Sequence, residues 1–301
     1  MKDTKISKEG FEINDNATQK RKTLFFDPGN GTSVLVVPEV MKKLGISLIS
    51  VNSHIDGRFP GRPSEPTAIN LERTLNIARQ MEFTYGAALD GDADRLILID
   101  EKGNFIIGDK VCALGAMLLL QQKKGAVVTT VATSNVLRDV ALENGGKIIY
   151  TKVGAPYLVE KVVNENAVFG GEEVGGLINP AFSLAKDGPY WTAKIIELLE
   201  QKGQLSKIIS NLPEYFSEKM KVHCPHQKKH GVIEKMKSIL ANASTELIEL
   251  DGVRGELSES EWVIVRASGT EEYIRIFAEA KSQEKAHKIA IQYMKEVERC
   301  L

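Results

Sequence analysis

Residues 85–100 read Tyr-Gly-Ala-Ala-Leu-Asp-Gly-Asp-Ala-Asp-Arg-Leu-Ile-Leu-Ile-Asp. The apolar runs 85–89 and 96–100 have the length and composition of two buried strands. The polar residues 90–95, here called the acidic turn, separate these strands. The sequence therefore predicts a β-type pair of strands with a charged turn at one end.

The acidic turn places three carboxylates at alternate positions, Asp90, Asp92 and Asp94. Small residues separate them, so all three side chains can converge on one hard cation. Mg²⁺ prefers oxygen ligands and usually keeps water or phosphate in its remaining positions. Arg95 follows directly, and a guanidinium there can hold a phosphate beside the metal. The pattern predicts a Mg²⁺ site.

The acidic turn has two alternative interpretations. An EF-hand places a Glu at position twelve, which Glu101 matches, but it needs Gly at position six, where Arg95 stands. A β-type run also follows, where an EF-hand continues as a helix. A plain acidic turn without a metal is the other alternative. The metal site is favoured over both.

Strands and helices alternate on both sides of the acidic turn, which is typical of mostly parallel α/β units. Residues 1–22 are polar without sustained periodicity and are predicted to be a tail or linker. The first unit, 23–122, is expected to hold strands over 24–26, 46–51, 85–89 and 96–100 and helices over 34–44, 71–79 and 111–120. The second, 123–216, is expected to hold strands over 126–131, 147–152 and 167–169 and helices over 135–144, 156–166 and 190–200.

The last stretch, 217–301, has a different pattern. Strands are expected over 219–223, 247–250, 262–266 and 273–279, with helices over 232–241 and 283–299. Several strands before an amphipathic closing helix indicate a small α+β domain. The predicted fold class is α/β, with two tandem mixed α/β (βαβ-type) domains plus a small C-terminal α+β domain.

Composition excludes several classes of protein. Of 301 residues, 43% are hydrophobic and 26% are charged, a balance that excludes a disordered chain. Lys plus Arg number 39 against 40 for Asp plus Glu, so the basic excess of a general nucleic-acid binder is absent. The longest apolar run, 111–120, is half a membrane span and predicts a buried helix.

Cysteine usage and the N-terminus point to a compartment. Cys112, Cys224 and Cys300 are scattered, and no CxxC pair exists, so the sequence indicates no disulfide framework. The first residues carry no apolar core of a signal peptide. A soluble protein of the reducing cytoplasm is expected, without a nucleic-acid or membrane partner.

A second chemical signal lies between two of the last predicted strands. The segment 265–271 reads Val-Arg-Ala-Ser-Gly-Thr-Glu, and residues 268–271 are here called the Ser-Gly-Thr turn. Two arginines, two hydroxyls and one Gly form a set suited to phosphate: Arg266, Ser268, Gly269, Thr270 and Arg275. An ordinary surface turn between two strands has a similar composition and is the alternative.

A third signal is glycine-rich. Residues 169–177 read Phe-Gly-Gly-Glu-Glu-Val-Gly-Gly-Leu, which predicts a loop after a short strand. Glycine allows a ligand to approach the backbone closely, and Glu172 can accept hydrogen bonds from sugar hydroxyls. Glycine loops are common turns, so this signal is weak by itself.

Four His and Cys residues close in the sequence are predicted not to form a zinc site. His223, Cys224, His226 and His230 lie at a predicted strand end and polar turn. Their spacing and the cysteine count match no standard zinc set.

Together, in this order, the acidic turn, the glycine-rich segment and the Ser-Gly-Thr turn resemble the α-D-phosphohexomutases, the phosphoglucomutase/phosphomannomutase superfamily. Segments 27–31, 56–62 and 251–253 also look like that family, and the resemblance covers more than nine tenths of the chain. The glycine-rich segment is most similar to archaeal-type members, which include phosphoglucosamine mutases. The family has four domains around one cleft, and this chain looks like domains two, three and four.

The resemblance assigns a role to each candidate residue. Asp90, Asp92 and Asp94 would hold Mg²⁺ in a metal-binding domain, and Arg95 would line the active site. Glu172 would contact sugar hydroxyls in the next domain. The phosphate that is not transferred would bind Arg266, Ser268, Gly269, Thr270 and Arg275. The implied reaction interconverts hexose 1-phosphates and 6-phosphates, with mannose or glucosamine slightly preferred.

The family's first domain carries a phosphorylated serine in a Thr-Ala-Ser-His-Asn-Pro-like segment. The present sequence contains no match to this segment. Ser53-His54 is the only Ser-His pair, and it precedes a domain-two segment. A separate protein with the serine domain is therefore expected as a partner. The alternatives are a non-catalytic phosphosugar-binding module and a truncated version of a full-length mutase.

Three positions depart from the family pattern. Val174 stands where many members have a serine, and Glu272 stands where a proline is usual. Ala155 occupies a position that is polar or charged in many members. These departures bear on the identity of the substrate more than on the fold.

Overall fold

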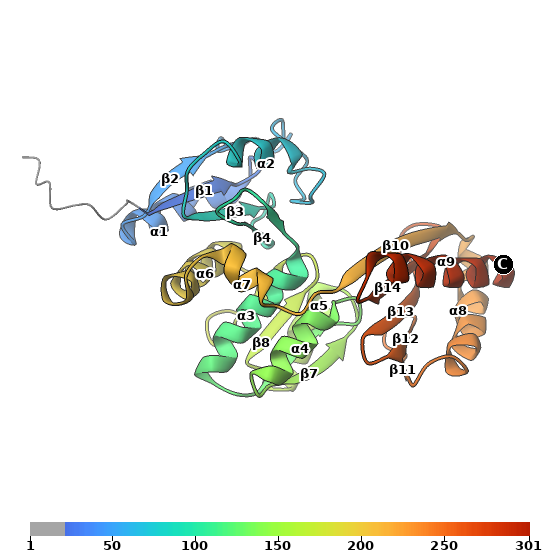
Figure 1. The fold of residues 1–301 in the computed structure, drawn as a ribbon. Helices are drawn as coiled ribbons and strands as arrows, with labels where there is room; N and C mark the ends of the chain where they lie inside the picture. Colours follow the sequence, from blue (N-terminus) through green and yellow to red (C-terminus); the bar gives the residue numbers. More distant parts are fainter. Residues whose placement is uncertain (1–21) are drawn as a thin grey trace, which may run out of the picture.

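Three separate β-sheets organise the part of the chain that the computed structural model describes, residues 22–301 (Figure 1). Two sheets are mixed and the third is antiparallel, and helices pack on all three. The predicted fold class is thereby confirmed. The expected tail over 1–22 lies outside the described residues, apart from Lys22.

The first sheet has the strand order β2-β1-β3-β4-β5. Its strands are β1 (Thr23–Asp27), β2 (Ser47–Ser50), β3 (Tyr85–Leu89), β4 (Leu96–Ile99) and β5 (Phe105–Ile106). β1 pairs in parallel with β2 and β3, whereas β4 and β5 are antiparallel to their neighbours. The acidic turn therefore follows the carboxyl end of β3.

Successive side chains of β1 point to opposite faces of the first sheet, and each face is covered by a helix. Leu24 and Phe26 pack with α1 (Val37–Lys43), which a short 3₁₀ helix (Thr32–Leu35) precedes. Phe25 points to the other face and packs with α2 (Glu72–Ala78).

The second sheet has the order β7-β6-β8-β9. Its strands are β6 (Ala126–Thr130), β7 (Lys147–Thr151), β8 (Phe169–Glu172) and β9 (Gly176–Ile178). Its helices are α3 (Gly108–Gln122), α4 (Asn135–Glu143), α5 (Ala155–Asn164), α6 (Gly188–Lys202) and α7 (Leu205–Ser210). β6 is parallel to β7 and β8, and β9 is antiparallel to β8.

Helix α3 explains the longest apolar run. It packs against α4, α6, β4, β8 and β9, so almost all of its circumference is covered. Within residues 22–301, no helix combines the length and apolarity needed to cross a membrane. Of these partners only β4 belongs to the first sheet, and the others are strands of the second sheet or helices that follow α3 in the chain, so we assign α3 to the second unit instead of the first.

The glycine-rich segment is a β-hairpin, not the predicted loop. β8 begins at Phe169 and β9 at Gly176, and only residues 173–175 form the turn. The glycines permit close packing inside the sheet, because a Cβ at Gly170 would lie 2.6 Å from Val162 Cγ2. Residues 169–178 are called the glycine hairpin below.

The third sheet is antiparallel in the order β10-β14-β13-β12-β11. Its strands are β10 (Phe216–His223), β11 (Glu246–Ile248), β12 (Val253–Ser258), β13 (Glu261–Ala267) and β14 (Tyr273–Ala280). Val263 and Val265 of β13 pack under α8 (His226–Ala241) and α9 (Gln283–Cys300). The alternate residues Trp262 and Ile264 pack on Val131 of the second unit.

A buried arginine fastens the third unit to the second. Arg254 is fully buried, and its Nε lies 2.8 Å from Glu256 Oε1. Its Nη1 donates to the carbonyl of Val131 at 2.8 Å, and its Nη2 donates to Asn135 Oδ1 at 3.2 Å. The guanidinium also lies 4.1 Å from the Trp262 ring centroid.

Two buried carboxylates meet the amino end of α4 beside this junction. Asp109 Oδ1 accepts from the Ser134 amide at 2.7 Å, and Glu279 Oε1 accepts from the Asn135 amide at 2.8 Å. Burial raises the pKa of Asp109 to about 7, against the lowering effect of its bond from Ser134. The facing charges of Glu173 and Glu279 raise the same pKa further, and Lys219 lowers it.

This raised pKa predicts a pH dependence of stability. Between pH 3.8 and about 7 the folded protein keeps a proton on Asp109 that the unfolded chain has lost. The free energy of unfolding contributed by Asp109 therefore falls as pH rises through that window. The free energy of unfolding of the wild type, measured relative to that of Asp109→Asn, should fall by about 2 to 3 kcal/mol between pH 5 and pH 7. Urea denaturation at several pH values measures the difference, and a flat difference would contradict it.

Candidate functional site

The acidic turn rests on a buried network from the two preceding loops. Arg62 is buried, and its Nε lies 3.1 Å from Oδ2 of the fully buried Asp27. Arg62 Nη2 donates to the carbonyl of Leu89 at 2.6 Å, which fixes the end of β3 immediately before the turn. Ser64 Oγ accepts from the Gly91 amide at 3.0 Å. Segments 27–31 and 56–62 thus support the turn.

The three predicted carboxylates come together at the surface end of β3. One oxygen from each of Asp90, Asp92 and Asp94 lies within 4.8 Å of the others. Asp90 is buried, and its Oδ1 accepts from the Arg95 amide at 3.1 Å. Ala93 has a φ of 65°, the left-handed conformation that bends the chain back on itself.

The electrostatics of the cluster favour a cation. Burial raises the pKa of Asp90 to about 7; the Arg95 amide opposes this effect, and repulsion from Asp94 and Asp92 adds to it. Asp94 Oδ1 is buried and lacks a hydrogen-bond partner within residues 22–301. A bound cation satisfies this oxygen and relieves the repulsion.

The second unit holds the acidic turn from both sides. The Leu96 amide donates to the carbonyl of Gly175 at 2.9 Å, and the Gly188 amide donates to the carbonyl of Ala93 at 2.9 Å. Gly175 has a φ of +86°, and a Cβ there would lie 2.2 Å from the Leu96 oxygen. Only glycine fits this contact, so the glycine hairpin is built to touch the turn.

Lys186 joins the acidic turn to Glu172. Its Nζ lies 2.7 Å from Asp94 Oδ2 and 2.8 Å from Glu172 Oε1, and its side chain is nearly buried. Burial lowers the pKa of Lys186, but the bonds to Asp94 and Glu172 outweigh burial and leave it raised. Sequence reasoning missed Lys186. Its one local signal is its place before Asp187, whose Oδ1 caps α6 by accepting from the Tyr190 amide.

Two further side chains complete this part of the site. Arg95 forms an ion pair with Glu65, and its Nε lies 3.7 Å from both Asp90 Oδ2 and Asp94 Oδ1. Glu173 turns away from Lys186, since its Oε2 accepts from Thr130 Oγ1 at 2.8 Å. Of the two glutamates in the hairpin, Glu172 is therefore the one beside the metal candidate.

We expect Lys186→Met to lower the free energy of unfolding by about 2 kcal/mol, because two close carboxylates lose their shared cation. Added MgCl₂ should reduce this loss, since Asp94 can then face a metal ion. Thermal melting with and without MgCl₂ measures both effects. Lys194→Met is the control; Lys194 lies on α6, the helix that begins two residues after Lys186, and pairs with Glu197. Equal melting of the two variants would contradict the prediction.

The predicted phosphate residues form a second cluster, between β13 and β14. Gly269 and Thr270 are exposed, and Ser268 is buried beneath them. Arg266 Nη2 lies 2.8 Å from Asp251 Oδ2, and that oxygen also accepts from the Val153 amide of the second unit. Arg275 pairs with Glu271 at 2.7 Å. Within residues 22–301, no hydrogen bond or ion pair joins this cluster to the acidic turn.

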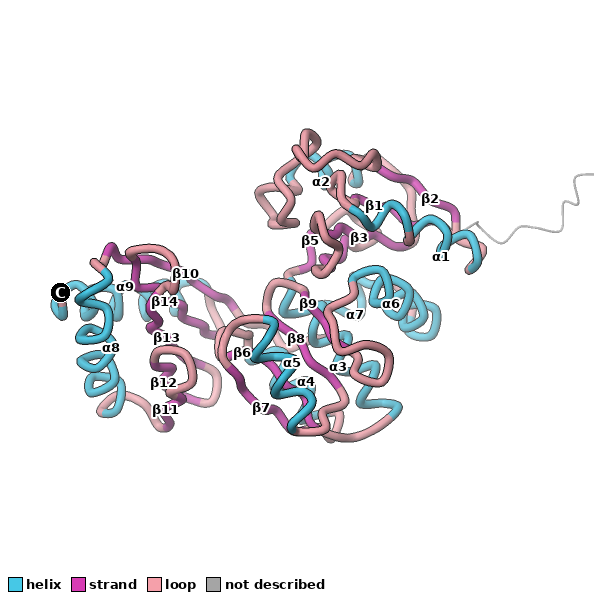
Figure 2. Tube along the Cα trace, turned by 180° about the vertical axis from the view of Figure 1, so that it is seen from behind, coloured by secondary structure: helices cyan, strands magenta, loops and turns pink. Residues whose placement is uncertain are grey.

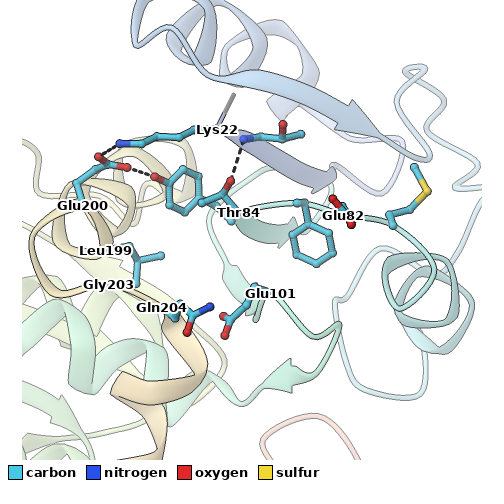
Figure 3. A pocket seen from close by; sticks show the side chains of 12 residues that line it. Lys22, Glu82, Thr84, Glu101, Leu199, Glu200, Gly203 and Gln204 are labelled. Atoms are coloured by element: carbon cyan, nitrogen blue, oxygen red, sulfur yellow. Dashed lines mark hydrogen bonds and ion pairs between the residues drawn. The ribbon is translucent and has the colours of Figure 1, made fainter. Parts of the chain in front are cut away.

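A cavity of about 640 Å³ lies elsewhere, between the first sheet and the end of α6 (Figure 3). Glu200 there accepts from the Tyr85 hydroxyl and pairs with Lys22. β1 and β3 begin at this cavity and end near the acidic turn, so the two features lie at opposite ends of these strands. None of the predicted site residues lines it.

Comparison with known proteins identifies the family. Three models of the phosphoglucomutase/phosphomannomutase family match consecutive parts of the chain: domain II over 4–103, domain III over 107–216 and the C-terminal domain over 220–296. The chain belongs to this family. The domain III match begins just before α3, in agreement with the packing of that helix. We propose a boundary near residue 107, in place of the one expected at 122.

Curated relatives match over most of this chain. The phosphoglucomutase/phosphomannomutase of Thermococcus kodakarensis is 42% identical over 270 residues, covering 89% of this chain and 59% of the relative. A "Probable phosphoglucosamine mutase" of Methanopyrus kandleri is 38% identical over 277 residues, covering 91% and 61%. The chain thus spans about three fifths of the length of these relatives.

Solved structures share the fold. A phosphoglucomutase/phosphomannomutase family protein from Burkholderia thailandensis superposes with a TM-score of 0.82 at 24% identity, covering 94% of this chain and 61% of that one. The N-acetylphosphoglucosamine mutase of Aspergillus fumigatus, in complex with GlcNAc-6P and magnesium, gives a TM-score of 0.67 at 18% identity, covering 93% and 62%.

Proposed function

We propose that this chain supplies the metal-binding, sugar-binding and phosphate-holding parts of a phosphohexomutase. The observation that carries the proposal is the bridge by Lys186, which joins Asp94 of the acidic turn to Glu172 of the glycine hairpin. The proposed reaction interconverts the 1-phosphate and 6-phosphate of a hexose, with mannose or glucosamine preferred. The names of the curated relatives support this substrate class.

Mg²⁺ fits the acidic turn. Asp90, Asp92 and Asp94 offer only oxygen atoms, and the buried Asp94 Oδ1, which accepts no hydrogen bond from residues 22–301, is suited to a hard cation. We propose that these three residues hold it. When bound, Mg²⁺ supplies positive charge that offsets the negative charge of a transferring phosphoryl group.

The chain's own residues have distinct proposed roles. Arg95 and Lys186 lie beside the carboxylates and can bind phosphoryl oxygens. Glu172 can accept hydrogen bonds from sugar hydroxyls. The phosphate that is not transferred is held by the Ser-Gly-Thr turn with Arg266 and Arg275. A bisphosphate intermediate that turns around between two transfers needs these groups to accept either end of the sugar.

The phosphoryl donor is proposed to be a serine on a separate domain, since none of these 301 residues forms the family's serine segment. An in-frame serine segment upstream of Met1 in the coding DNA would instead place the donor in the same protein. The three cysteines are free and buried, and we propose the reducing cytoplasm as the site of action.

A mutase assay tests the proposal. The chain is incubated with Mg²⁺, a hexose bisphosphate primer and mannose 1-phosphate or glucosamine 1-phosphate, with and without a supplied serine domain. Turnover that requires the added domain supports a split enzyme. No turnover of either hexose phosphate in either mixture would overturn the proposal.

A non-catalytic phosphosugar-binding module is the second candidate. The position of Lys186 favours it, because its ammonium pairs with Asp94 and Glu172 and so offsets part of their negative charge without a catalytic metal. Binding of hexose phosphate without turnover, with the serine domain present, would favour this function over the mutase.

A further inference from the structure

The first turn of α8 lies directly behind the Ser-Gly-Thr turn. α8 packs on the third sheet beside β12 and β13 (Figure 2). Lys229 in its first turn is 7% exposed. Its Nζ donates to the carbonyl of Ser268 at 2.7 Å and to the carbonyl of Glu271 at 2.5 Å. One ammonium group thus ties both ends of the turn.

The amides of the turn are differently engaged. The Ser268 amide donates to the carbonyl of Tyr273 at 2.9 Å, and the Glu271 amide donates to Ser268 Oγ at 3.2 Å. Within residues 22–301, the amides of Gly269 and Thr270 have no acceptor. A Cβ placed on Gly269 would meet nothing within 4 Å, so the space beside it is open. A turn with free N–H groups and open space is suited to an anion.

The charge of Lys229 is not neutralised. Arg266 pairs with Asp251, and Arg275 pairs with Glu271. Lys229 forms no ion pair with any residue from 22 to 301, although burying a cation without an opposite charge is costly. The carbonyl oxygens of Ser268 and Glu271 offset only part of the cost of burying the Lys229 ammonium. A bound anion on the turn supplies the opposite charge that Lys229 lacks.

Residues of the His223–His230 region contribute to this arrangement. The Cys224 amide donates to the carbonyl of Glu272 at 2.8 Å, and the His226 amide donates to Glu272 Oε1 at 3.3 Å. His226 Nδ1 lies 3.2 Å from Lys229 Nζ. These contacts anchor the start of α8, and with it Lys229, to the chain just after the turn.

We propose that Lys229 is a positioning residue for the phosphate held by the Ser-Gly-Thr turn. It fixes the carbonyls of Ser268 and Glu271, keeps the amides of Gly269 and Thr270 available, and contributes a net positive charge. The hexose phosphate as ligand rests on the proposed function. The anion site itself is testable with inorganic phosphate.

The test uses Lys229→Met, Lys229→Gln and the control Lys228→Met in the full chain. Lys228 is exposed and donates to the Leu301 carbonyl. Inorganic phosphate and glucose 6-phosphate are titrated while the amide NMR signals of Gly269 and Thr270 are followed. Lys229→Met should weaken both affinities by about tenfold or more. Lys229→Gln, which keeps the donors without the charge, should lose less, and Lys228→Met should stay within about twofold.

The outcomes separate this inference from the mutase proposal. Unchanged phosphate affinity in a folded Lys229→Met variant overturns the role of Lys229. If that variant has no melting transition, wild-type affinity in Lys229→Gln overturns it instead. Phosphate binding that depends on Lys229, without turnover beside the serine domain, overturns the mutase alone. No phosphate binding by the wild type overturns both.

Discussion

The Asp92→Asn variant should bind Mg²⁺ about tenfold or more weakly and, with the serine domain supplied, turn over hexose phosphate about 100-fold or more slowly. Asp92 is the exposed member of the acidic cluster, so its replacement leaves the core intact. Losing its charge also reduces the repulsion that Asp90 experiences. Loss of activity should therefore occur without loss of thermal stability. Calorimetric titration with MgCl₂, melting curves and the coupled mutase assay measure the three quantities.

Glu284→Gln is a matched control for the change in net charge. Glu284 is exposed on α9 and pairs with Lys288, in a different unit from the acidic turn. Its replacement should leave Mg²⁺ affinity and turnover within about twofold of wild type. Wild-type Mg²⁺ affinity in Asp92→Asn would exclude Asp92 as a metal ligand.

The sequence predicts best where local pattern and tertiary packing agree. β3 is found over Tyr85–Leu89 as predicted, because its apolar run is buried between helices on both faces. The acidic turn could be predicted from the sequence because its three carboxylates lie within five consecutive residues. A single turn brings the three carboxylates together, and the apolar runs on either side of it show where that turn lies.

Sequence reasoning failed where a contact depends on the tertiary fold. Lys186 lies fourteen residues after Glu172, and only the return of the chain from β9 to α6 brings the two together. Lys229 and Ser268 are separated by 39 residues and meet because α8 packs on the third sheet. Gly170 and Gly171 are predicted to lie in a loop, yet they form part of β8, because neighbouring side chains occupy the space of their missing Cβ atoms.

The second large effect concerns the junction between the second and third units. We expect Arg254→Met to lower the free energy of unfolding by about 3 to 5 kcal/mol, because Glu256 then keeps a largely buried charge without its partner. The carbonyl of Val131 and the Asn135 side chain also lose their donors. Urea denaturation followed by tryptophan fluorescence measures the loss, since Trp262 lies in this junction.

Arg299→Met is the control for removal of an arginine. Arg299 is exposed on α9 and pairs with Glu296, so its replacement should cost about 0.5 kcal/mol or less. The loss of stability in Arg254→Lys should lie between those of Arg254→Met and Arg299→Met, because an ammonium keeps the charge but cannot replace the several hydrogen bonds of a buried guanidinium. A loss below about 1 kcal/mol in Arg254→Met would show that Trp262, Ile264 and their apolar neighbours hold the junction without the arginine.

Arg254→Met should also distinguish binding of inorganic phosphate by the Ser-Gly-Thr turn from binding of a hexose bisphosphate across the units. The Ser-Gly-Thr turn and Lys229 both belong to the third unit, so a loosened junction should leave inorganic phosphate affinity within about threefold of wild type. In the proposed function a hexose bisphosphate contacts that turn and the acidic turn at once, so its affinity should depend on the relative position of the units. We expect Arg254→Met to weaken bisphosphate binding about tenfold or more, measured at a temperature where the variant is folded. Equal loss for both ligands would place the effect inside the third unit and not at the junction.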